Sequence, residues 1–167
     1  QGAGTLNFTG LKKHAIQSSG KTTVNSGTIN VLSAVKDGMN VDSFVINGGT
    51  VSVNNPNGDG IDADQGYIEV AGGALNITCS ANDAKGLCCD STLTVSAGTV
   101  KITLSGADSK GMKSDSAMFI AGGSVTIVST GDTCKGISCN SNLTITGGTV
   151  DVTVGGAASK GIKTDGN

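Results

Sequence analysis

The stretch SKGMKSD at residues 109–115 recurs with small changes, and its recurrence decides the fold. Related stretches are AKGLCCD at 84–90, CKGISCN at 134–140 and SKGIKTD at 159–165. Each places a lysine and a glycine before an apolar residue, and each ends on an aspartate or an asparagine. Neighbouring copies lie 25 residues apart, which indicates one structural unit repeated along the chain.

Two series of glycines carry this period through most of the chain. The first series, expected to mark a turn, stands before the apolar residue of each unit: Gly38, Gly60, Gly86, Gly111, Gly136 and Gly161. The second series stands before a run of alternating side chains: Gly27, Gly49, Gly73, Gly98, Gly123 and Gly148. Both series advance by 22 to 26 residues and stay in step. The sequence therefore predicts about six repeats of ~25 residues.

Each unit also contains short runs in which apolar and polar residues alternate, such as GTVKITL at 98–104 and GTVDVTV at 148–154. Alternation with a period of two is typical of β-strands that bury one face. Aligned units form apolar columns, one of which reads Ile29, Val51, Leu75, Val100, Val125 and Val150. We therefore expect an all-β fold, a right-handed parallel β-helix (β-solenoid) with three short strands in each coil. A β-sandwich of hairpins would not explain columns that stay in register.

The alignment predicts where unusual side chains lie. Tyr67 aligns with Phe44 and Leu93 and is expected to be buried. Cys89 and Cys139 align with small inward residues two coils apart, which is too far for a disulfide.

One cysteine is expected to differ from the rest. Cys79 aligns with core residues, whereas Cys88 aligns with Lys113 and Lys163 and is expected to face outward.

The ends of the chain depart from the repeat. Residues 1–13 fit it poorly and are expected to form an N-terminal strand or cap segment, while 14–167 form a single β-helix domain. The final coil reaches Asn167 without a capping segment. Bare solenoid ends expose apolar columns and strand edges. The chain is thus expected to be a fragment of a longer solenoid, or to have its ends covered by other subunits.

Composition limits the possible functions. The net charge is −2 with mixed signs, without the basic face that nucleic-acid binding requires. No apolar run approaches the ~18 residues of a membrane span. Without tryptophan, and with Phe119 as the only ring expected on the surface, the chain lacks an aromatic platform for neutral glycans.

Charged residues fall into two columns in the later coils. Lysines precede the first glycine series: Lys85, Lys110, Lys135 and Lys160. Five residues later come Asp90, Asp115, Asn140 and Asp165. Like charges stacked at ~5 Å repel by about 1 kcal/mol per pair in bulk water, so we expect lysines and aspartates to neutralise one another.

The earlier coils lack these lysines, because Asp37 and Asp59 take their place. In GIDAD at 60–64, Asp62 and Asp64 share the outward side. A Ca²⁺ ion takes six to eight oxygen ligands, which stacked carboxylates and amides can supply. We therefore predict a calcium site formed by Asp37, Asn40, Asp42, Asp59, Asp62 and Asp64.

The units DSKGMKSDSAMFIAGGSVTIVSTGD at 108–132 and TCKGISCNSNLTITGGTVDVTVGG at 133–156 resemble the repeats of a bacterial carbohydrate-binding domain family. The family comprises extracellular right-handed β-helix proteins, typified by a pectin- and cellulose-binding protein of a cellulolytic clostridium. The resemblance covers roughly residues 36–167. It implies calcium sites along the edge of the helix and binding of acidic polysaccharide without established catalysis.

The sequence therefore predicts a non-catalytic, extracellular or cell-surface protein that binds acidic polysaccharide, such as pectin or polygalacturonate, with the help of calcium. Sugar carboxylates are expected to meet the lysine column of Lys85, Lys110, Lys135 and Lys160. The alternative is a surface adhesin or filament subunit that stacks end to end as a homo-oligomer. A polysaccharide lyase is less favoured, since such enzymes commonly abstract a proton with arginine or lysine. This chain has no arginine, and its lysines are repeated rather than singular.

Overall fold

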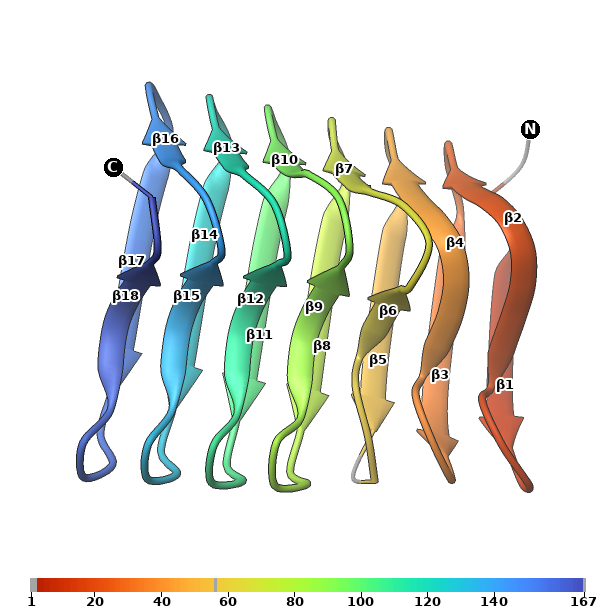
Figure 1. Ribbon diagram of the computed structural model, residues 1–167. Helices are drawn as coiled ribbons and strands as arrows, with labels where there is room; N and C mark the ends of the chain where they lie inside the picture. Colours follow the sequence, from red (N-terminus) through yellow and green to blue (C-terminus); the bar gives the residue numbers. More distant parts are fainter. Residues whose placement is uncertain (1–2, 56, 167) are drawn as a thin grey trace.

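The computed structural model describes residues 3–55 and 57–166, which form a solenoid of parallel strands (Figure 1). One strand of each coil belongs to a seven-stranded sheet: β1 (Thr5–Gly10), β3 (Thr28–Ala34), β5 (Thr50–Asn55), β8 (Ala74–Cys79), β11 (Thr99–Leu104), β14 (Ser124–Ser129) and β17 (Thr149–Val154). The other strands form an eleven-stranded sheet. The expected all-β parallel solenoid of about six coils of ~25 residues is confirmed.

The larger sheet contains one long strand in each of the early coils and two short strands in each later coil except the last, which contributes β18 alone. The early strands are β2 (Ile16–Val24) and β4 (Met39–Ile46). The later strands are β6 (Ile61–Ala63), β7 (Ile68–Val70), β9 (Lys85–Cys89), β10 (Leu93–Val95), β12 (Lys110–Ser114), β13 (Met118–Ile120), β15 (Lys135–Cys139), β16 (Leu143–Ile145) and β18 (Lys160–Thr164). Because β4 pairs with both β6 and β7, the sheet continues across the corner that separates the two.

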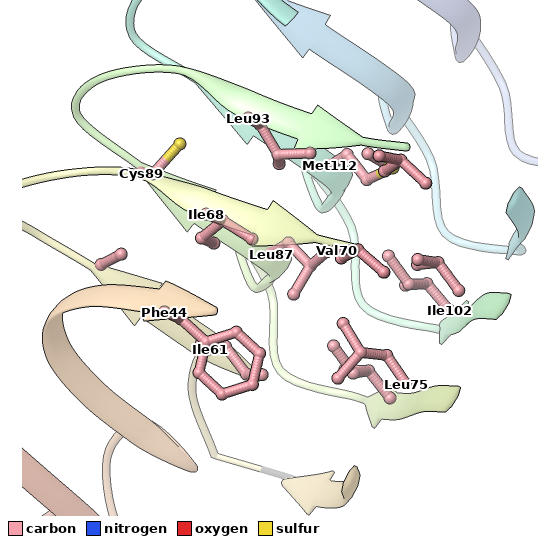
Figure 2. Packing of buried hydrophobic residues seen from close by; sticks show 14 of the residues in the cluster. Phe44, Ile61, Ile68, Val70, Leu75, Leu87, Cys89, Leu93, Ile102 and Met112 are labelled. Atoms are coloured by element: carbon pink, nitrogen blue, oxygen red, sulfur yellow. The ribbon is translucent and has the colours of Figure 1, made fainter. Parts of the chain in front are cut away.

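The core lies between the two sheets as stacked apolar columns. Val51, Leu75 and Val100 occupy one column, pair in register and are fully buried. Figure 2 shows side chains of successive coils packing in this interior. Full burial of a side chain of this size contributes about 1.5–3 kcal/mol, so each added coil extends the core by one layer.

The column that contains Phe44 and Leu93 is completed by Ile68 rather than Tyr67. Ile68 pairs with both residues and is fully buried (Figure 2), whereas Tyr67 is partly exposed. The prediction that Tyr67 lies in the core is therefore wrong. The corner between β6 and β7 is one residue longer than the corner between β9 and β10, which shifts the register by one position.

The glycine after each repeated lysine lies in a strand, so the expected turn role is wrong. A Cβ on Gly86, within β9, would lie 2.6 Å from the carbonyl oxygen of Gly111 and 2.6 Å from Cγ2 of Ile102. The glycine is needed because neighbouring coils and the facing sheet leave no room for a side chain. Left-handed backbone occurs elsewhere, at Gly98 (φ 79°) and at Asp83 (φ 57°).

All five cysteines are free and buried. Cys79, Cys89 and Cys139 lie in the core as expected. Cys88 aligns with Lys113 as predicted, but it is only 7% exposed. A position that holds an outward lysine in β12 therefore holds a buried thiol in β9.

The N-terminal segment adds a strand to the solenoid. β1 pairs in parallel with β3, with an irregularity after Phe8. Whether a boundary falls at residue 13 stays a prediction. In the last described coil, Ile145 and Ile162 are 46% and 48% exposed, and end-to-end stacking also stays a prediction. No helix long and apolar enough to cross a membrane occurs in residues 3–55 and 57–166.

Candidate functional site

The charged residues gather along one edge of the solenoid, at the start of the strands that follow the long loops. The pairing of β4, β6, β9, β12, β15 and β18 sets them in three columns. The first column is Asp37, Asp59, Lys85, Lys110, Lys135 and Lys160. The second is Asn40, Asp62, Cys88, Lys113, Ser138 and Lys163. The third is Asp42, Asp64, Asp90, Asp115, Asn140 and Asp165.

We call this surface the charged edge. Its acidic half comprises the coils whose first column holds Asp37 and Asp59. Its lysine half comprises the coils whose first column holds lysine. The first column thus changes sign between Asp59 and Lys85, although the backbone register is unbroken.

The four predicted lysines stand in one column, but their surroundings differ. Asp83 lies between Lys85 and Lys110, with Nζ–carboxylate distances of 3.3 and 2.9 Å. The hydrogen bond from Lys110 and the charges of both lysines hold the pKa of Asp83 below its usual range, against a smaller effect of burial. Lys135 donates to the Thr133 carbonyl at 3.4 Å. In the described part of the chain, neither Lys135 nor Lys160 has an acidic side chain within ion-pairing distance.

Charge neutralisation in the third column comes from lysines of the second column. Lys113 Nζ lies 2.8 Å from the Asp115 carboxylate, and Lys163 Nζ lies 2.6 Å from that of Asp165. Asn140 donates its side-chain amide to Asp115 at 2.9 Å. Lysines therefore neutralise aspartates of the third column, but they are Lys113 and Lys163, two residues away on the same coil, and not the lysines of the first column that the sequence predicted.

The six predicted calcium ligands fall into two groups. Asn40, Asp42 and Asp64 line a polar pocket of about 520 Å³, and the Asn40 amide donates to Asp64 at 3.3 Å. The pocket is completed by Gln17, Ser18, Ser19 and Gln65. Sequence reasoning missed the three residues from β2, because the first coil lies outside the regular repeat.

The second group is buried more deeply and includes a cysteine. Asp59, Asp62 and Cys88 each offer one ligand atom, and these three atoms lie within 4.8 Å of one another. Asp59 Oδ1 accepts the backbone N–H of Lys85 at 2.7 Å, and its Oδ2 lies 3.9 Å from Lys85 Nζ. Burial raises the pKa of Asp59 to about 6, against the backbone hydrogen bond and the charge of Lys85. Burial, then the charge of Asp37, raises the pKa of Asp62 to about 6, while a hydrogen bond from Cys88 opposes the shift.

Asp37 connects this group to the first coil. Its Oδ1 accepts the backbone N–H of Asp59 at 3.1 Å, and its Oδ2 lies 3.1 Å from His14 Nδ1. The His14 side chain is 6% exposed, and its Nδ1 lacks the geometry of a hydrogen bond. The repeat did not identify His14 or Cys88 as part of this group. His14 precedes the regular repeat, and Cys88 occupies a position that holds lysine in other coils.

A separate hollow of about 550 Å³ lies between the beginnings of β1 and β3 and residues 23–27. Its lining contains no ionisable side chain. It therefore offers no charged group to a cation or to an acidic sugar, and the charged edge is the better candidate.

The fold and the charged edge define a repeat-built β-solenoid with ionic groups arrayed along one side. A family model described as a carbohydrate-binding domain-containing protein matches residues 1–161. The chain belongs to this family, and its membership supports polysaccharide binding. Neither the curated proteins nor the solved structures gave a match.

Proposed function

We propose that the protein is a non-catalytic, extracellular or cell-surface module that binds uronate-rich polysaccharide with the help of calcium. The observation that carries the proposal is the change of sign along the charged edge. One half presents carboxylates that attract a cation, and the other presents amines, all on strands in continuous register. Both halves suit a chain of sugar carboxylates, which amines can pair directly and a bound cation can bridge.

The polar pocket of the acidic half is the better calcium candidate of the two groups. Its side chains supply oxygen from two carboxylates, three amides and two hydroxyls: Asp42, Asp64, Gln17, Asn40, Gln65, Ser18 and Ser19. This donor set fits a hard cation that takes six to eight oxygens, some of them from water or ligand. A sugar carboxylate could complete the coordination because the pocket opens to solvent.

Within the lysine half, Lys135 and Lys160 are the best placed to meet sugar carboxylates. Lys85 and Lys110 already share Asp83, so a uronate would have to compete with that carboxylate. Exposed ion pairs contribute about 0–1 kcal/mol each, which means that single lysines add little and the column acts through their sum.

Binding of polygalacturonate and of fully methyl-esterified pectin tests the proposal, each with calcium and with chelator. We expect binding to polygalacturonate that weakens on chelation and at high salt, and little binding to the esterified polymer. Equal binding to both polymers, unaffected by calcium, would contradict it. Unsaturated products released from polygalacturonate would contradict the non-catalytic part alone.

A further inference from the structure

We propose that Asp59, Asp62 and Cys88 form a second cation site, selective for a thiophilic divalent ion of the zinc class. This inference goes beyond polysaccharide binding and does not depend on it. The site lies where the acidic half meets the lysine half, on two adjacent strands, β6 and β9, and the loop that leads into β6.

The positions of the three donors fit such an ion. Their ligand atoms lie within 4.8 Å of one another. In a tetrahedral zinc site with Zn–O near 2.1 Å and Zn–S near 2.3 Å, neighbouring ligand atoms are roughly 3.5 Å apart. Side-chain rotation that moves the carboxylate oxygens by about 1 Å would bring the ligand atoms to the spacing of a zinc site. Three protein ligands and one open position for water are a frequent zinc arrangement.

The cysteine decides which ion is preferred. Calcium takes oxygen ligands, whereas thiolate favours zinc and other soft or borderline metals. Cys88 is more than nine-tenths buried, and its sulfur lies within 4.8 Å of carboxylate oxygens of Asp59 and Asp62. Cys89, Cys134 and Cys139 instead donate to backbone carbonyls, as thiols with a packing role do. Binding would replace the S–H bond by an S–metal bond, with release of the proton to solvent.

The charge around the three donors also calls for a cation. Asp83, Asp115 and Asp165 of the lysine half are each paired with a lysine. In residues 3–55 and 57–166, no basic side chain lies within 4.0 Å of Asp62, and Asp59 has only Lys85, at 3.9 Å.

An independent observation comes from the adjoining carboxylate. Asp37, which accepts the backbone N–H of Asp59, faces the buried Nδ1 of His14, and this nitrogen makes no hydrogen bond. This buried imidazole nitrogen lies outside the group of three donors, beside a carboxylate that adjoins the group.

Cobalt(II) is the probe that tests the site, because thiolate–Co²⁺ coordination produces a charge-transfer band. Metal-free, reduced protein is titrated with Co²⁺, and bound Co²⁺ is then displaced with Zn²⁺ or with Ca²⁺. We expect a thiolate band that saturates at about one equivalent, disappears with Zn²⁺ and persists with excess Ca²⁺. Absence of the band, or its displacement by Ca²⁺ as readily as by Zn²⁺, would overturn the proposal.

Two serine variants separate a ligand from a packing cysteine. Cys88→Ser has a precedent in this fold, because Ser138 occupies the same register position two coils on. Cys134→Ser is the matched control, since Cys134 stands in the column that holds Ser109 and Ser159. We expect Cys88→Ser to lose the band and to bind zinc at least about tenfold more weakly, and Cys134→Ser to keep both. A band that survives in Cys88→Ser would contradict the assignment.

A measurement on the unmodified chain covers the case in which a variant fails to fold. Wild-type protein is alkylated under mildly destabilising conditions with and without Zn²⁺, and each cysteine is quantified by peptide mapping. We expect Zn²⁺ to slow the alkylation of Cys88 at least about tenfold relative to Cys134. Equal protection of the two cysteines would contradict the proposal. Polysaccharide binding is measured separately, so failure here leaves the calcium-assisted function standing.

Discussion

The two halves of the charged edge share one backbone and differ in how they balance charge. In the lysine half, each of Asp83, Asp115 and Asp165 has a lysine within 3 Å. In the acidic half, Asp59 and Asp62 are half-buried, and burial raises the pKa of each to about 6. The strand register therefore continues unchanged along the solenoid, while the carboxylates differ: some are paired with lysines, and others are partly buried and attract a cation.

The joint between the halves is expected to give the largest effect. In Gly86→Ala, the new Cβ would lie 2.6 Å from the Gly111 carbonyl and 2.6 Å from Ile102 Cγ2, and neither can yield easily. We expect a loss of about 3 kcal/mol or more in unfolding free energy, measured by denaturant melts. Gly161→Ala is the matched control, because its nearest contact beyond its chain neighbours is Val152 Cγ1 at 3.9 Å. Equal losses in the two variants would contradict the packing explanation.

A smaller effect should follow from the raised carboxylate pKa values. Because Asp59 and Asp62 have higher pKa values in the folded than in the unfolded chain, the folded state binds more protons between pH ~4 and ~6. The unfolding free energy should therefore fall as pH rises through this window and stay low above it. A shift of two pKa units corresponds to about 3 kcal/mol, and coupling between the two groups reduces what either contributes alone.

Asp62→Asn sharpens that expectation. In chelator at pH 7, we expect the variant to be about 2 kcal/mol more stable than wild type and to show a flatter pH dependence. Asp151→Asn, on an exposed position of β17, is the control and should change neither. Thermal melts across pH 4–7 measure both quantities. An unchanged pH slope in Asp62→Asn would show that burial of this carboxylate does not destabilise the fold.

The smallest expected change concerns the lysine half. Asp83→Asn removes the negative charge shared by Lys85 and Lys110, and asparagine tolerates the left-handed backbone at this position (φ 57°). We expect stability to change by less than about 1 kcal/mol, because the Asp83 side chain is 66% exposed. Binding of polygalacturonate should strengthen about two- to threefold, since an exposed charge contributes a few tenths of a kcal/mol or more. Weaker binding would show that Asp83 itself contacts the ligand.

Much of the fold could be predicted from the sequence, because a solenoid repeats one packing problem in every coil. The period of the glycines and the columns around Leu75 and Ile102 were enough to establish the parallel strands and their register. Tyr67 was misplaced because a single added residue in a corner shifts only the strand that follows it. The glycines that follow the lysines were expected in turns. Their actual role, to let neighbouring coils and the facing sheet approach closely, leaves no signal in the local sequence.

The site was predicted less completely than the fold. The repeat placed the charged columns, and the structure sets them along one edge. The repeat pattern alone could not show which acidic residues line the polar pocket and which belong to the buried group, because that depends on the burial of each side chain. Cys88 and His14 were missed because each departs from the repeat, and their surroundings come from neighbouring coils.

The most direct test of the account measures whether both halves of the charged edge act on one polyanion. The affinity for polygalacturonate is compared in wild type and Lys135→Gln/Lys160→Gln, each with calcium and with chelator, with Lys101→Gln on the opposite sheet as control. We predict that chelation and the double substitution each weaken binding several-fold, that together they abolish it, and that Lys101→Gln has no effect. The account would be contradicted if neither chelation nor the double substitution changed the affinity, or if Lys101→Gln reduced it as much as the double substitution does.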